Sequence, residues 1–288
     1  MKSLLILFCI IGINSSIYSQ RSIQIIDDEN KCIPFVEITL FYLSDSIRNY
    51  STINGKVTID DTLNLNSIRF SHVSHQNKIV SSNELSDTVI LERKISELPE
   101  VEVSPNTNKR HRRLGVKQRF RQMRIINNSG YEIITLFNDP DLAGWSIDEF
   151  IFHSVEMEGR YRGYFRIVFY ENDKGLPSSR IPIDNLYYLE RNMNNKSSID
   201  LTEFNITFPD SGVFVGIEWL GNDTIPKINS FEVQYSRVFN SNFYYRPKDH
   251  PSFSRFKLLD DNWIRMDNSN QFFHDYCIPT FQLILSNN

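Results

Sequence analysis

The chain has 288 residues, of which 40% are hydrophobic and 23% are charged. That balance excludes a disordered chain, a coiled coil and a protein with several membrane spans. A formal net charge of −4 and a pI near 5.9 argue against nucleic-acid binding by the chain as a whole. Aromatic residues make up 13%, and Phe and Tyr far outnumber Trp, a composition that favours strands over helices.

Residues 1–20 have the three-part plan of a secretory signal peptide. A short positive start precedes an apolar run, 4–13, which is followed by a small and polar tail, 14–20. The apolar run is too short to cross the roughly 30 Å hydrocarbon core of a bilayer. We therefore expect an exported chain that is cleaved near residue 20.

Beyond the leader the chain keeps two cysteines, Cys32 and Cys277. Export permits a disulfide between them, but two cysteines do not make a disulfide framework. Two separate, small, buried side chains are the simpler interpretation.

Charge divides the rest of the chain into three parts. Residues 104–124 hold eight Lys and Arg and no Asp or Glu, whereas the segments on either side are acidic. The block opens with the polar cluster 104–108, which is typical of a linker. We predict an N-terminal domain over 21–103, a basic linker over 104–124 and a C-terminal domain over 125–288.

Short strand-like runs follow one another through 21–103 at intervals of about ten residues, as in an all-β sandwich. Asn54–Gly55 predicts a two-residue hairpin turn, because both positions of such a turn need positive φ. The predicted strands are 22–26, 35–42, 56–60, 67–73, 78–81 and 88–91.

The order of these strand-edge signals also carries a resemblance. Residues 33–38, 52–57 and 68–73, followed by 88–92 and 98–103, resemble the carboxypeptidase-regulatory-like domain. The resemblance implies a small transthyretin-like β-sandwich, of the kind common at the N-terminus of exported gram-negative envelope proteins. The chain departs from that family at Ser74–His75, where the family usually has Gly-Tyr.

Residues 125–288 are also strand-like. The strongest runs are 147–156, 164–170, 198–201, 213–220, 231–236 and 281–285. Residues 165–171, the turn 175–177 and residues 212–219 resemble the uncharacterised C-terminal half that accompanies this regulatory-like module. The resemblance implies a second, larger, jelly-roll-like sandwich with no established chemistry. The predicted fold class is therefore all-β, a transthyretin-like sandwich followed by a larger jelly-roll-like one.

His153 and Glu156 match the spacing of two zinc ligands in a peptidase. The surrounding run is predicted to be a strand, in which residues three apart point to opposite faces and cannot hold one ion. His72 and His75 have the same spacing and meet the same objection. A nucleophile elbow, a phosphate-binding loop and a dinucleotide fingerprint are absent from the sequence, so we predict no catalytic residue.

Two loop clusters carry the hard oxygen ligands that Ca²⁺ prefers. Acid-rich turns are also the ordinary composition of loops, so a structural calcium site and a plain turn both stay open. No other cofactor is expected. The candidate ligands are Asp139, Asp141, Asp260 and Asp261.

Arg166 and Glu218 each stand as one charged residue inside a run that is otherwise apolar. We predict that they pair across the second sandwich. A buried ion pair costs roughly 3–5 kcal/mol to break from one side. The functional alternative, Glu218 as a general acid, needs a second carboxylate at a fixed distance.

The segment 239–250 is aromatic and polar without a clean period. Exposed aromatic faces beside hydrogen-bonding groups are typical of a glycan-binding loop. The alternative is a long loop that folds its aromatic rings back onto the core. The candidate ligand-binding residues are Phe243, Tyr244, Tyr245, Arg246 and Lys248.

The basic block offers a contact with an anionic surface, such as lipid phosphates or acidic polysaccharide, through Lys109, Arg110, Arg112 and Arg113. The alternative is a solvated linker. Together these features predict a non-catalytic exported binding or assembly module of the cell envelope, in the periplasm, on the outer-membrane surface or outside the cell. Its partner is expected to be an envelope protein or a glycan, and not nucleic acid. A carbohydrate-binding protein is the first alternative, and a peptidase or glycosidase is the second.

Overall fold

The computed structural model describes residues 20–60, 65–94, 110–116, 122–125, 129–155, 163–189, 196–221, 238–242, 250–258, 261–266 and 278–287. These residues form strands and three short 3-10 helices, Ser82–Glu84, Pro140–Leu142 and Thr202–Phe204. The predicted all-β fold class is confirmed. Within the described part of the chain, no helix has the length and apolar character needed to cross a membrane.

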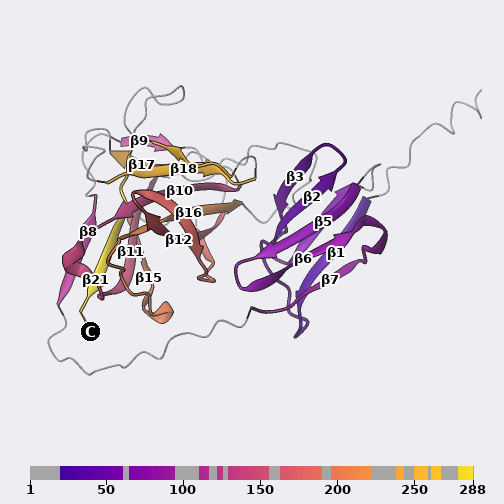
Figure 1. Ribbon diagram of the computed structural model, residues 1–288, viewed down its shortest axis with the longest axis horizontal. Helices are drawn as coiled ribbons and strands as arrows, with labels where there is room; N and C mark the ends of the chain where they lie inside the picture. The colour runs from indigo at the N-terminus through magenta and orange to yellow at the C-terminus, as the bar shows by residue number, and fades with distance from the viewer. Residues whose placement is uncertain are drawn as a thin grey trace, which may run out of the picture.

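The N-terminal part is a sandwich of two sheets (Figure 1). Its strands are β1 Gln20–Asp27, β2 Glu37–Tyr42, β3 Ser46–Tyr50, β4 Lys56–Asp60, β5 Leu65–His72, β6 His75–Ser81 and β7 Thr88–Leu91. One sheet has the order β4-β1-β7 and the other has the order β3-β2-β5-β6. Alternate residues of both sheets face one another and form a shared core of buried Ile, Val, Leu and Phe side chains.

The Asn54–Gly55 turn is not the predicted hairpin. The strands on either side of it, β3 and β4, belong to different sheets, and only Gly55 of the pair has positive φ, at +68°. A Cβ at position 55 would lie 2.6 Å from the carbonyl oxygen of Ile25. Glycine is therefore required here because the turn passes close to β1, and not because two strands pair across it.

The C-terminal part contains two seven-stranded sheets. Their strands are β8 His111–Gly115, β9 Gln122–Ile125, β10 Tyr131–Phe137, β11 Ser146–Val155, β12 Gly163–Asp173, β13 Leu176–Ile181, β14 Tyr187–Leu189, β15 Lys196–Asp200, β16 Val213–Gly221, β17 Val238–Asn242, β18 Ser252–Phe256, β19 Ile264–Arg265, β20 Ile278–Pro279 and β21 Gln282–Ser286. The sheet β13-β12-β16-β10-β18-β19, to which β14 adds at β12, is called the interface sheet below. The sheet β20-β17-β11-β21-β8, with β15 on β11 and β9 on β17, is called the outer sheet.

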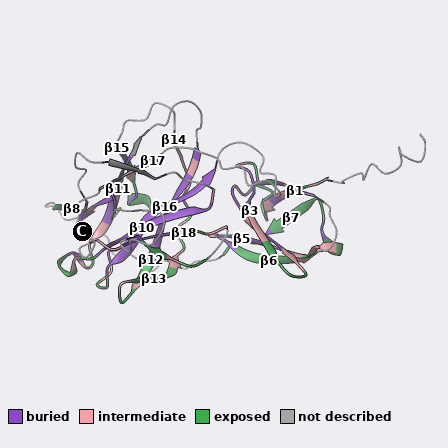
Figure 2. Ribbon diagram, turned by 90° about the horizontal axis from the view of Figure 1, so that it is seen from above, coloured by how far each residue is buried: buried purple, intermediate pink, exposed green. Residues whose placement is uncertain are grey.

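The two central strands of the interface sheet, β10 and β16, are buried along their whole length and on both faces (Figure 2). One face packs against the outer sheet, where the aromatic rings of Phe150, Phe165 and Trp219 belong to the largest core cluster. The other face carries a smaller apolar cluster that includes Val168 and Phe214. Successive residues of β10 and β16 are therefore buried alternately on the side of the larger and on the side of the smaller of these two clusters.

The two sandwiches meet through an apolar cluster. Phe35 and Tyr50 of the first sandwich pack with Leu220 of the interface sheet. The ring centroid of Phe35 lies 5.1 Å from that of Tyr164. Phe35 has φ of +48°, a value rare for a bulky residue, and this conformation accompanies its place in the junction between the sandwiches.

The basic segment predicted as a linker over 104–124 contains two strands of the second sandwich. Strand β8 pairs with β21 at the edge of the outer sheet, and β9 pairs with β17. An edge strand tolerates charged side chains because one side of it faces solvent. Arg112 and Arg113 are exposed there, while Leu114 packs on the core and Val116 is buried. The second sandwich therefore begins earlier than the charge pattern indicates. The predicted strand 231–236 lies outside the described residues.

Candidate functional site

Four charged side chains form a row across the interface sheet, on the face turned away from the outer sheet. Glu218 of β16 lies opposite Arg166 of β12 on one side and opposite Glu132 of β10 on the other. Glu132 in turn lies opposite Arg255 of β18. Because side chains alternate along a strand, the neighbours of these residues point into the apolar core, and the charges share one face.

Glu218 is fully buried and receives three hydrogen bonds. Tyr50 Oη donates at 2.6 Å, Arg180 Nη2 at 2.8 Å and Lys257 Nζ at 3.2 Å. Burial raises the pKa of this carboxyl, but the charges of Arg180, Lys257 and Arg166 outweigh it and hold the pKa well below its usual range. Glu218 is therefore an anion held by cations from both sides.

Glu132, which is also fully buried, is held in a similar way. Arg255 Nε donates to it at 2.6 Å, Tyr170 Oη at 3.0 Å, and Arg180 Nη1 lies 3.6 Å away. The guanidinium of Arg255 also lies over the ring of Trp263, 4.2 Å from its centroid. The row of charges thus ends on a cation stacked against an aromatic ring.

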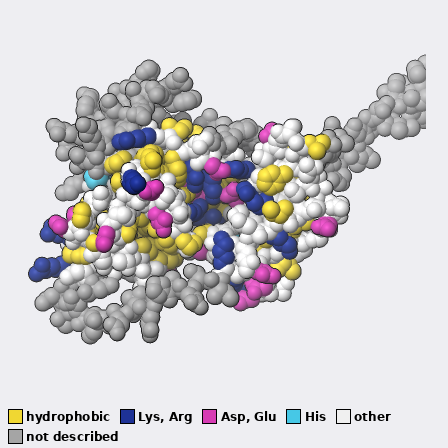
Figure 3. Space-filling view, viewed as in Figure 1, with side chains coloured by type: hydrophobic (Ala, Val, Ile, Leu, Met, Phe, Trp, Pro, Cys, Tyr) yellow, Lys and Arg dark blue, Asp and Glu magenta, His cyan; other side chains and the backbone are white. Residues whose placement is uncertain are grey.

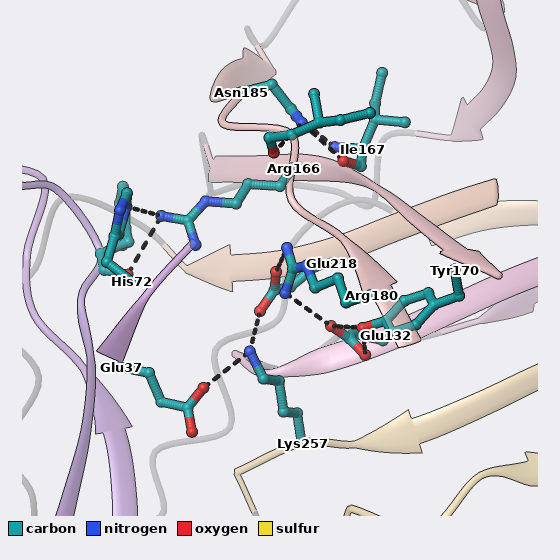
Figure 4. A network of polar contacts seen from close by, with 12 residues as sticks. Glu37, His72, Glu132, Arg166, Ile167, Tyr170, Arg180, Asn185, Glu218 and Lys257 are labelled. Atoms are coloured by element: carbon teal, nitrogen blue, oxygen red, sulfur yellow. Dashed lines mark hydrogen bonds and ion pairs between the residues drawn. The ribbon is translucent and has the colours of Figure 1, made fainter. Parts of the chain in front are cut away.

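Side chains of the N-terminal sandwich complete the network (Figure 4). Lys257 Nζ lies 2.9 Å from Glu37 Oε2 as well as contacting Glu218. Arg48 Nη1 donates to the backbone carbonyl of Lys257 at 3.0 Å and pairs with Asp261 at 2.7 Å. Charged groups of both sandwiches therefore neutralise one another across their junction.

Arg166 lies opposite Glu218, as the predicted pair requires, but its hydrogen bonds go to the first sandwich. Its Nη2 donates to His72 Nε2 at 2.9 Å and to the carbonyl oxygens of Pro34 at 3.3 Å and Phe35 at 3.4 Å. The ion-pair partners of Glu218 among the described residues are Arg180 and Lys257. Arg166 and Glu218 interact only through space.

His72 and His75 lie together, which corrects the sequence argument that placed them on opposite faces. The chain turns between them, so they face each other across the β5–β6 hairpin with their Nδ1 atoms 3.2 Å apart. Because an arginine only donates, His72 Nε2 must accept from Arg166, and the ring proton of neutral His72 sits on Nδ1. Burial, then the charge of Arg166, lowers the pKa of His72 to about 2.

A cavity of about 320 Å³ opens where these groups meet. Figure 3 shows basic and acidic side chains gathered at the same junction between the two halves of the molecule. Glu132 and Glu218 lie behind the cavity wall. The cavity is lined by Glu37, Tyr50, Ser71, His72, Val73, Asn77, Lys94, Arg166, Tyr170, Arg180, Pro182, Arg255 and Lys257.

The predicted ligand-binding residues Phe243, Tyr244, Tyr245, Arg246 and Lys248 lie outside the described residues. The same holds for the leader 1–19, for Lys109, for Glu156 of the zinc-like pair and for Cys277. Cys32 is an exposed free thiol. Arg110 is exposed just before β8, like the two arginines within that strand.

The predicted calcium ligands fall in separate places. Asp139 caps the 3-10 helix Pro140–Leu142, where its carboxylate accepts from the backbone nitrogen of Asp141 at 3.2 Å. Asp261 pairs with Arg48, and Asp260 lies outside the described residues. Across the part of the chain that the structure describes, no three His, Cys, Asp or Glu side chains gather as metal ligands.

Most members of the network were not predicted from the sequence. Glu132 carries the same signal as Glu218, an acid inside a run that is otherwise apolar, and could have been found with it. Arg180 carries no such signal, because it stands in an ordinary polar stretch, and Lys257 follows the end of β18 instead of standing inside a strand. Their role follows only from the strand order.

Comparison with known proteins gives no family assignment. No protein-family model matches the chain, and no curated protein matches it. Among solved structures, a proposed carbohydrate-binding protein from Bacteroides uniformis ATCC 8492 is similar with 10% identity and a TM-score of 0.22, over 76% of this chain and 95% of that one. The function proposed next rests on the geometry of this chain alone.

Proposed function

We propose that this protein is a binding module that holds a small polar ligand, a carbohydrate, in the cavity between its two sandwiches. The single observation behind the proposal is that cavity, which measures about 320 Å³ and has side chains of both sandwiches in its wall. Pockets from roughly 300 Å³ upward hold small ligands in proteins. A ligand there would contact both halves of the molecule at once.

The lining of the cavity fits a ligand rich in hydroxyl groups. Each sugar hydroxyl donates one hydrogen bond and accepts others, so its site needs both kinds of partner. The carboxylate of Glu37 accepts, the ammonium of Lys94 donates, and Asn77 and Ser71 can do either.

The state of the two buried acids favours binding over hydrolysis. A glycosidase needs one carboxyl group that is protonated and can reach the scissile oxygen. Glu218 has a lowered pKa, so it is ionised, and both Glu218 and Glu132 are fully buried and hydrogen-bonded to cations. We therefore propose a non-catalytic role.

A glycan array followed by calorimetric titration of the best glycan tests the proposal. Asn77→Ala removes one hydrogen-bonding group from the cavity wall and should weaken binding about 3- to 10-fold. Gln76→Ala is the matched control, because Gln76 is exposed on the same strand and does not line the cavity. Equal effects of the two substitutions would refute the cavity as the site.

The aromatic segment 239–250 is the competing site and needs its own variant. Replacing Tyr244 and Tyr245 together by Ala should leave glycan affinity within about twofold if the cavity binds the ligand. Loss of binding in this double variant, with Asn77→Ala unaffected, would move carbohydrate binding to the segment.

The proposal includes export, which the apolar run 4–13 supports. Intact-mass analysis of protein recovered from the periplasm or medium of an expressing cell should give a chain that starts at residue 20, 21 or 22. A chain that keeps residues 1–19 in the cytoplasm would contradict this part of the proposal.

A further inference from the structure

We propose that the cavity selects an acidic saccharide and that Arg166 binds its carboxylate. This inference rests on the function proposed above and adds the charge of the ligand to it. Three features of the site support it: the missing counter-ion of Arg166, its unused donors, and the net charge of the wall.

Arg166 is a buried cation without a carboxylate partner. It is 4% exposed, and no ion pair joins it to a carboxylate among the described residues. Its nearest side-chain partner, His72, accepts a hydrogen bond as a neutral ring and so brings no negative charge. Asp184, on an exposed loop, and Glu218 attract it only through space. A buried charge of this kind is costly unless something pairs with it.

Two of the three nitrogens of the Arg166 guanidinium donate to no described residue. All three of its hydrogen bonds come from Nη2, and Nε is buried with no partner. Nη1 makes no hydrogen bond to the described residues either. Arg166 lines the cavity, and a planar guanidinium with unused N–H groups matches a carboxylate in geometry and charge.

The net charge around the cavity is positive. Arg166, Arg180, Arg255 and Lys257 are only partly exposed or buried, and they face three carboxylates, Glu37, Glu132 and Glu218. Lys94 at the rim is a fifth cation, so two positive charges are left over, those of Arg166 and Lys94. An acidic saccharide would supply the missing negative charge.

Lys94 and Asn77 supply the rest of the site. Both are exposed at the edge of the same cavity, on the first sandwich, whereas Arg166 comes from the second. An acidic sugar could place its carboxylate on Arg166 and its hydroxyls on Asn77 and Ser71. Lys94 at the rim would attract the anion on its way in.

The test compares two trisaccharides of the same length in calorimetric titrations of the full mature chain. Trigalacturonate should bind at least about tenfold more tightly than neutral galactotriose, and its affinity should fall as salt is added. Arg166→Gln should reduce trigalacturonate affinity about 10- to 100-fold, since it removes a charge-assisted hydrogen-bonding group, and should leave the weaker affinity for galactotriose nearly unchanged. Arg166→Lys keeps the charge but loses the planar guanidinium. Its affinity for trigalacturonate should lie between those of the wild type and Arg166→Gln.

Arg166 is buried, so its substitution can change the packing of the junction as well as the binding. Lys94→Gln is therefore a second test that does not alter the junction. Lys94 is exposed, so this variant should fold normally and bind trigalacturonate about 2- to 5-fold more weakly. Arg112→Gln is the control, an exposed arginine on β8 that does not line the cavity, and should bind like the wild type.

Each other outcome counts against a stated part of the proposal. Equal binding of the two trisaccharides, with no effect of Arg166→Gln or Lys94→Gln, overturns the acidic-saccharide inference and leaves the carbohydrate proposal standing. Preference for a sulfated galactose oligomer over trigalacturonate overturns the assignment to a carboxylate. Absence of binding to any saccharide overturns the proposed function itself.

Discussion

Acidification is expected to destabilise the junction between the sandwiches through His72. The Nε2 atom of His72 accepts a hydrogen bond from Arg166, and burial and that positive charge lower the pKa of His72 to about 2. In the unfolded chain the pKa of a histidine is about 6.5. The unfolded chain therefore binds a proton between these two values and the folded chain does not, so stability is complete above pH 6.5 and falls as the pH drops below it.

The size of the effect follows from that difference. One proton taken up only by the unfolded chain changes the free energy of unfolding by about 1.4 kcal/mol per pH unit. His72 alone should therefore cost roughly 2 kcal/mol of stability between pH 6.5 and pH 5. His75 and His153, whose pKa values are also lowered mainly by burial, act in the same direction.

Urea unfolding at several pH values between 7 and 5 measures this slope. All three tryptophans lie beyond residue 125, so their fluorescence reports the second sandwich, and circular dichroism reports both. His72→Gln keeps an acceptor for Arg166 but cannot titrate, and its slope should be shallower than that of the wild type by a difference that grows to about 1.4 kcal/mol per pH unit near pH 5. His111→Gln removes a mostly exposed histidine whose Nδ1 lies 3.7 Å from Asp148 Oδ2; it should not make the slope shallower and is the control. Parallel slopes for His72→Gln and the wild type would refute the reasoning.

Three further substitutions test the network and the sheet that carries it. Glu218→Gln leaves the cations around it without their counter-ion and should lower the free energy of unfolding by about 3–5 kcal/mol; a urea midpoint equal to that of the wild type would show that the network adds no stability. Gly216→Ala places a Cβ 1.9 Å from a backbone carbonyl oxygen of β10, so we expect a loss of roughly 3 kcal/mol or more in a thermal melt, and an unchanged Tm would contradict the close approach of β10 and β16. Asn185 donates to and accepts from the backbone of Ile167 at 2.8 and 2.7 Å, so Asn185→Ala should cost about 2–4 kcal/mol and speed hydrogen exchange at the Ile167 amide; unchanged exchange there would count against that role.

Alternation of side chains predicted most of the strands. Among the runs expected in the second sandwich, 213–220 appears as β16 and 281–285 overlaps β21. The same alternation singled out Glu218 as an acid in an apolar setting. This works because a charged residue inside an apolar strand run stands out in the sequence, without knowledge of the neighbouring strands.

The partners of that acid could not be predicted in the same way. Arg180 stands on β13 and Lys257 directly follows β18, and both reach Glu218 only because the order β13-β12-β16-β10-β18 brings distant parts of the chain together. Strand order and register are set by the packing of the whole sheet, and one strand does not encode them. The histidine pair shows the complementary failure. The rule that residues three apart face opposite ways holds only within one strand. His72 ends β5 and His75 begins β6, so the rule does not apply to them.

The apolar and charged contacts at the junction also have a consequence for inheritance. Tyr50 and Glu37 come from one sandwich, and the groups they satisfy, Glu218 and Lys257, come from the other. Recombination that exchanged the first sandwich for an unrelated one would leave Glu218 and Lys257 of the second sandwich without these partners. The two sandwiches are therefore expected to be inherited together. A change on one side of the junction should be accompanied by a compensating change on the other.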